Sequence, residues 1–119
     1  MFIRKIVKCP SFTAGDNTLL RELFNPLKDS LKVRYSLAHA AVKPGEITCR
    51  HKLKTSEVYY ILRGKGTVYI DKENAEVEEG DAIYIPPESK QRIKNTGKEN
   101  LVFLAIVDPA WRLEDEEIL

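Results

Sequence analysis

Short runs of apolar residues, separated by turn signals, occupy the middle of the chain. The runs are rich in Val, Ile, Tyr and Thr, which is typical of β-strands. The predicted strands are residues 33–42, 58–62, 67–70, 82–85 and 101–107. Tight turns join them, and no helical stretch is long enough to connect parallel strands. The pattern therefore predicts an antiparallel β-sandwich or barrel.

The two ends of the chain follow this pattern less closely. Residues 1–8 mix apolar and charged positions and are predicted to form an edge strand, because charge interrupts any signal-peptide pattern. The segment 18–24 fits one or two helical turns or an early strand equally well. Beyond the last predicted strand, Asp108 is expected to cap a short helix that has Pro109 in its first turn and carries Trp111.

The length of the chain predicts one domain. With 119 residues, 43% of them hydrophobic, the chain can bury one core without disulfides or a structural metal. A single domain over residues 1–119 is expected, with an N-terminal arm at 1–30, a barrel core at about 31–108 and a tail at 109–119. The acidic run 114–117 in that tail is interpreted as a solvated face.

Two predicted strands carry apolar residues on both faces. In the first, alternation places Glu57, Tyr59 and Ile61 on one side. Its other side is also apolar, and the strand 101–107 behaves in the same way. A small barrel covers only the inner face of such strands. We therefore expect a homodimer in which sheets or N-terminal segments cover the outer face.

Charge and cysteine content limit the partners of the protein. Lys and Arg number 19 and Asp and Glu number 18, and the basic residues are scattered, so a nucleic-acid partner is not expected. No run approaches the roughly 20 apolar residues of a membrane span, so no membrane partner is expected either. Cys9 and Cys49 form no disulfide or zinc pattern, which favours a reducing cytoplasm. The charged fraction of 31%, with Gln91 as the only glutamine, is similar to that of thermophile surfaces.

The segment from residue 45 to residue 64 holds the richest chemistry. Gly45 is followed after five residues by His51, after a further five by Glu57, and after another six by Gly64. This spacing resembles the first motif of the cupin superfamily, which is glycine, five residues, His-x-His, three or four residues, glutamate, six residues and glycine. Leu53 stands at the position of the second histidine.

A second spacing supports the same resemblance. The second cupin motif is glycine, five residues, Pro-x-Gly, two residues, histidine, three residues and asparagine. This chain has Gly80, Pro86, Glu88 for the glycine, Gln91 for the histidine, and Asn95. The resemblance implies an all-β fold, an antiparallel double-stranded β-helix, or jelly-roll barrel, with short terminal helical turns.

The resemblance also implies a divalent metal ion inside the barrel. In the family, the two histidines, the glutamate and the later histidine hold it, and only His51 and Glu57 remain here as strong ligands. Alternation places Gln91 on the same inward face as Ile93 and Asn95. An amide oxygen is a weak ligand that suits hard cations better than zinc, so tight binding of a transition metal is not expected.

His39 is a candidate for the missing nitrogen ligand. It shares one strand face with Val33, Tyr35, Leu37 and Ala41, and these apolar neighbours suggest that this face points inward. In that case the metal ligands would be His51, Glu57, Gln91 and His39. Two simpler interpretations stay open: His39 is a core histidine, and His51 and Glu57 form a buried pair with no metal.

Six further residues are predicted to line the pocket. They are Tyr35, Cys49, Leu53, Tyr59, Tyr84 and Asn95. Tyrosines placed there would bring an apolar ring and a hydroxyl to the mouth. Cys49 is expected to face the same way as His51 and to behave as a small hydrophobic residue rather than as a nucleophile.

Three classes of function follow. The first choice is a binding protein that holds a small polar ligand, sugar-like or an organic acid, beside a degenerate metal site. The second is a metal-dependent cupin enzyme, with an activity like that of a sugar-phosphate isomerase or a dioxygenase. The third is a dimeric scaffold without catalysis. The loss of half of the usual ligands favours the first class.

Overall fold

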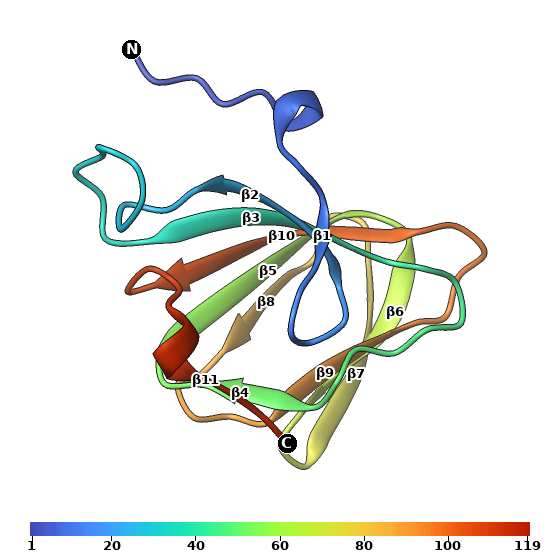
Figure 1. The fold of residues 1–119 in the computed structure, drawn as a ribbon. Helices are drawn as coiled ribbons and strands as arrows, with labels where there is room; N and C mark the ends of the chain where they lie inside the picture. Colours follow the sequence, from blue (N-terminus) through green and yellow to red (C-terminus); the bar gives the residue numbers. More distant parts are fainter.

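The structure, a computed structural model that describes all of residues 1–119, consists of two antiparallel sheets that face each other (Figure 1). The first has six strands in the order β1 (Phe12–Thr13), β2 (Leu19–Phe24), β3 (Ser36–Val42), β10 (Leu101–Asp108), β5 (Ser56–Arg63) and β8 (Ala82–Ile85). The second has five in the order β11 (Glu116–Ile118), β4 (His51–Leu53), β9 (Gln91–Asn95), β6 (Lys65–Ile70) and β7 (Glu73–Glu78). Two short 3-10 helices, η1 (Ile6–Lys8) and η2 (Leu113–Asp115), complete the chain. The predicted all-β jelly-roll class is confirmed.

Alternation along the strands places side chains as the sequence pattern predicts. In β9, Gln91, Ile93 and Asn95 are all buried, while the two residues between them are exposed. In β5, the predicted inward face is buried, and the opposite face is partly or fully exposed. Period-two burial is expected where one face of a sheet covers the core and the other meets solvent.

The hydrophobic core fills one end of the space between the sheets. Strands β3 and β10 pair antiparallel, with Val42 opposite Leu101 at one end and Ser36 opposite Val107 at the other. The fully buried side chains of Leu101, Phe103 and Ile61 lie toward the first end. Smaller and polar side chains point inward at the other end, and they leave an open space there.

Near the ends of the chain, the structure corrects two predictions and decides a third that the sequence left open. Residues 1–8 form no edge strand but an extended arm with the helix η1, and the arm leaves the body of the protein (Figure 1). The ambiguous segment 18–24 is the strand β2. The predicted helix after Asp108 is absent, since the residues around Trp111 are irregular and the 3-10 turn begins at Leu113. Its place is taken by a chain that returns to the second sheet as β11.

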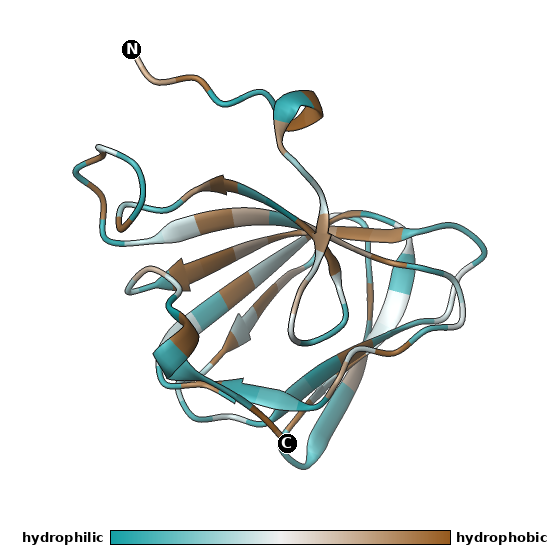
Figure 2. Ribbon diagram, viewed as in Figure 1, coloured by the Kyte–Doolittle hydropathy of each residue, from teal (hydrophilic) through white to brown (hydrophobic).

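Hydrophobic positions recur along the strands of the six-stranded sheet (Figure 2), and several of them are exposed on its outer face. Leu19, Tyr60, Leu62 and Tyr84 lie there, with 42%, 41%, 38% and 62% of their surface exposed. The homodimer predicted from this face stays a prediction. None of the helices has the length and apolar character that crossing a membrane takes.

Candidate functional site

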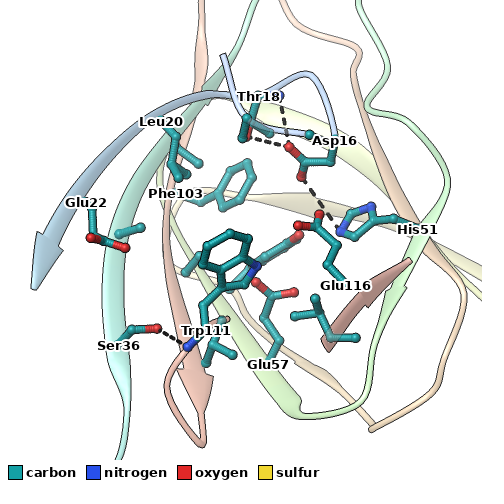
Figure 3. Close-up of a pocket in the computed structure, with 18 of the residues that line it drawn as sticks. Asp16, Thr18, Leu20, Glu22, Ser36, His51, Glu57, Phe103, Trp111 and Glu116 are labelled. Atoms are coloured by element: carbon teal, nitrogen blue, oxygen red, sulfur yellow. Dashed lines mark hydrogen bonds and ion pairs between the residues drawn. The ribbon is translucent and has the colours of Figure 1, made fainter. Parts of the chain in front are cut away.

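A cavity of about 210 Å³ lies between the two sheets, next to the hydrophobic core. Strands β2, β3 and β10 form most of an apolar wall, and β4, β5, β11 and the turn before β2 add polar groups (Figure 3). Its lining includes Phe12, Leu20, Ala38, Ala40, Phe103, Ala105 and Trp111 on the apolar side, and Asp16, Thr18, His51, Glu57 and Glu116 on the polar side. A mixed lining of this kind is typical of small-molecule sites.

His51 begins β4, and its ring is almost completely buried, with 3% of the residue exposed. Its Nδ1 lies 2.9 Å from the carbonyl oxygen of Cys49, which accepts a hydrogen bond, so Nδ1 carries the proton. The other nitrogen, Nε2, points toward Asp16, with Nε2 and Oδ2 3.8 Å apart (Figure 3). That distance is too long for a hydrogen bond.

Asp16 lies in the turn that leads into β2 and was not predicted as a site residue. Its Oδ1 accepts hydrogen bonds from the backbone N–H and the hydroxyl of Thr18, at 3.1 and 2.7 Å. These bonds fix the carboxylate and leave Oδ2 facing the cavity beside His51. Asp16 is about 35 residues before His51, and a backbone hydrogen bond from the N–H of Cys49 to the carbonyl oxygen of Asp16, at 2.7 Å, holds the two segments together.

Glu57, Gln91 and Tyr59 form a buried chain of hydrogen bonds behind the cavity. The amide of Gln91 donates to Oε1 of Glu57 at 3.0 Å, and the hydroxyl of Tyr59 donates to the amide oxygen of Gln91 at 2.8 Å. Burial, followed by the charges of Asp16 and Glu116, raises the pKa of Glu57 to about 8 against the lowering effect of Gln91. Burial also raises the pKa of Tyr59. Glu57 is therefore a neutral carboxylic acid at neutral pH.

Glu116 brings another carboxyl group into the cavity from the C-terminal tail. The acidic run 114–117, interpreted from the sequence as solvated, is divided: Glu114 and Glu117 are exposed, Asp115 is buried against Arg112, and Glu116 faces the site. Pairing of β11 with β4 places Glu116 opposite Leu53. Burial raises the pKa of Glu116, while the charge of His51 and a hydrogen bond from the Trp111 indole act in the opposite direction.

The prediction that His39 faces into the barrel is wrong. Ser36, Ala38 and Ala40 are the residues of β3 that line the cavity, so alternation places His39 on the outer face. The error arose because the outer face is more apolar than the inner face, which needs small side chains to leave room. His39 is half-buried there, opposite Arg21 and Leu104.

Four of the six predicted pocket residues also lie outside the cavity. Tyr35 is exposed and packs on Phe24, and Tyr84 lies on the outer face of β8. Cys49 is exposed because it precedes β4, where strand alternation does not apply. Asn95 is completely buried but holds the backbone at the end of β9. Leu53 and Tyr59 do line the cavity.

The side chains at this site do not fit a metal ion. Of the four family positions, Leu53 has no donor atom, and the oxygen of Gln91 is already bonded to Tyr59. His51 and Glu57 each keep one atom, Nε2 and Oε2, that could bind a metal ion. Nowhere in the protein do three His, Cys, Asp or Glu side chains converge closely enough to hold one ion. These side chains are suited to hydrogen bonding with a ligand rather than to coordinating a metal ion.

Comparison with known proteins agrees with the fold. Residues 38–107 match the family model described as Cupin domain. The uncharacterized protein MJ1618 of Methanocaldococcus jannaschii is 42% identical over 113 residues, which cover 94% of this chain and 90% of that protein. Glucose-6-phosphate isomerase of Thermococcus gammatolerans is 40% identical over 60 residues, or 46% of this chain, and the match spans only 32% of that enzyme.

A solved structure gives the same result for the fold alone. The Streptomyces protein Pac13, a nucleoside dehydratase, superposes with a TM-score of 0.81 over 100% of this chain and 91% of its own, at 17% sequence identity.

Proposed function

Because the chain belongs to the cupin family, we propose that it is a small-molecule binding protein whose barrel holds its ligand without a metal ion. The observation that carries this proposal is the cavity itself, which combines an apolar wall with a cluster of buried polar groups. Its volume, about 210 Å³, is below the range of roughly 300–1,000 Å³ of drug-sized sites. The ligand is therefore a single ring or a short chain.

The charged side chains of the cavity favour one of the two ligand classes that the sequence suggests, which are sugar-like compounds and organic acids. Lys28 is the only lysine or arginine of the lining, and its Nζ is bound to Glu22 at 2.9 Å. Asp16 and Glu116 meet no cation of this kind, so an organic acid or a phosphate would be buried beside carboxylates without a counter-charge. A neutral, sugar-like ligand or a positively charged one fits the cavity better.

The cavity also does not favour the alternative function, a metal-dependent cupin enzyme. Glucose-6-phosphate isomerase acts on a phosphate ester, and the matched region spans only 32% of that enzyme. In this chain the cavity offers neither a cation for the phosphate nor converging ligands for a metal. We therefore do not extend the isomerase activity to this protein.

A thermal-shift screen tests the proposal with neutral sugars, organic acids and amines. A compound that binds only the folded protein at ten times its Kd stabilises it by about 1.4 kcal/mol, which raises the melting temperature by about 5 °C. We expect such a rise with neutral or cationic compounds.

A pair of variants locates the binding. Ala38→Phe fills the cavity from its wall and is expected to abolish the shift. Ala41→Phe places the same ring on the outer face of the same strand and is expected to keep it. If no compound of any class shifts the wild-type protein, or if Ala38→Phe responds like the wild type, the proposal is wrong.

A further inference from the structure

The polar end of the cavity has more free hydrogen-bond acceptors than free donors. His51 is 97% buried, and its Nε2 accepts in the neutral ring, because Nδ1 carries the proton. Oδ2 of Asp16 lies 3.8 Å from it, and both atoms lack a hydrogen bond. Glu57 differs, because its Oε1 accepts from Gln91 and the proton of the neutral acid therefore lies on Oε2, which donates. Together with the carboxyl group of Glu116, Asp16 and His51 supply three acceptor groups around one space (Figure 3).

Apart from Glu57, the donors near these groups are already engaged. Both donors of Thr18 bind Oδ1 of Asp16, and the hydroxyl of Tyr59 binds Gln91. The Trp111 indole also lines the cavity, and its interaction with Glu116 lowers the pKa of that carboxyl group. A buried acceptor without a donor costs free energy, so the missing donors have to come from the ligand.

The apolar wall determines what else the ligand carries. Trp111 and Phe103 line the cavity beside the acceptors, together with Leu20. Aromatic faces attract both rings and cations, and a cation close to carboxylates in a partly desolvated site is held more strongly than in water. The wall therefore suits an organic body and the polar end suits a positive charge.

We propose that the cavity binds a small organic amine, with its ammonium group among Asp16, His51 and Glu116 and its apolar body against Trp111 and Phe103. The inference rests on the proposed function and narrows its ligand class. An ammonium group supplies three N–H donors and no acceptor, which matches the surplus of acceptors. The acceptors surround a cavity rather than a point, so they suit an ammonium group better than a metal ion.

Three probes with the same ring test the charge: benzylamine, benzyl alcohol and benzoate, measured by calorimetry at pH 7. We expect benzylamine to bind at least tenfold more tightly than benzyl alcohol, and benzoate not to bind. Asp16→Asn keeps the acceptor for Thr18 but loses the charge, and it is expected to weaken benzylamine at least tenfold while leaving benzyl alcohol unchanged. Glu116→Gln is a second variant of the same kind, and Glu76→Gln, on the exposed strand β7, is the matched control.

Each contrary outcome has a separate meaning. Equal affinity for benzylamine and benzyl alcohol would contradict the proposal of an amine ligand. Stabilisation of the protein by Zn²⁺ or Mn²⁺ alone, without any effect of benzylamine, would also contradict it. If neutral sugars bind and Ala38→Phe abolishes that binding, while benzylamine has no effect, this inference fails and the proposed function stands. If no compound binds in the thermal-shift screen or in the calorimetry, both the amine inference and the proposed function are wrong.

Discussion

The Glu57→Gln variant is expected to be more stable than the wild-type protein at pH 8, and the two proteins are expected to be equally stable near pH 4. Burial raises the pKa of Glu57 from an ordinary value of 4.5 to about 8. Below pH 4.5 the carboxyl group is protonated in both the folded and the unfolded state, so it adds no cost. Between pH 4.5 and 8 the unfolded chain releases the proton and the folded protein keeps it, so wild-type stability falls as the pH rises.

The size of this effect follows from the pKa difference. Each pH unit in that window costs up to about 1.4 kcal/mol, which accumulates to about 4 kcal/mol at pH 8. Glutamine has the same shape, cannot ionise, and still accepts the hydrogen bond from Gln91. Urea unfolding at pH 4, 6 and 8 measures the difference in the free energy of unfolding.

The control for this experiment is Glu76→Gln, because Glu76 is exposed on β7. It is expected to change stability by less than about 0.5 kcal/mol at each pH. A Glu57→Gln variant that is less stable than the wild type at pH 8 would mean that Glu57 is charged and paired in the folded protein. A gain of the same size at pH 4 and pH 8 would also contradict the expected ionisation.

Asn95→Ala is expected to destabilise the protein by about 4 kcal/mol, the second large effect. Asn95 is completely buried, and its side-chain amide donates to the carbonyl oxygens of Val42 and Glu99, both at 2.8 Å. Its Oδ1 accepts from the backbone N–H of Gly97 at 2.8 Å. Alanine leaves these three backbone groups without their partner, and each costs about 1–3 kcal/mol where water cannot replace it.

Urea unfolding of Asn95→Ala beside Asn74→Ala tests this role. Asn74 is an exposed residue of β7, and its loss is expected to cost little. A cost below about 1 kcal/mol for Asn95→Ala would show that the loop after β9 holds without it. The result bears on the sequence interpretation, which placed Asn95 in the pocket, whereas the structure gives it a part in connecting β9 to β3.

The fold and half of the site were predictable because they depend on local patterns. Alternation along β5 and β9 correctly placed Glu57, Tyr59 and Gln91 on inward faces, and motif spacing identified the jelly roll. The motif glycines also have a local cause. Gly64 has φ +86°, and a Cβ there would lie 2.9 Å from the carbonyl oxygen of Asn100, so that turn requires glycine.

The rest of the site depends on contacts between residues far apart in the sequence, which local sequence patterns do not predict. Asp16 is held near His51 by the backbone hydrogen bond between Cys49 and Asp16, and Glu116 faces the cavity only because β11 pairs with β4. His39 was misplaced for a related reason. Apolar character indicates an inward face, but a strand beside a cavity carries small residues inward, as Ser36 and Ala38 do.

This cupin barrel keeps the frame of a metal site, and we propose that it binds its ligand without the metal. Elemental analysis of the protein purified without chelators, together with native mass spectrometry, shows directly whether a metal ion is bound. We predict no stoichiometric transition metal, and the same melting temperature before and after dialysis against EDTA. One metal ion per chain, lost together with stability on dialysis and absent from His51→Ala, would mean that the barrel is a metal site after all.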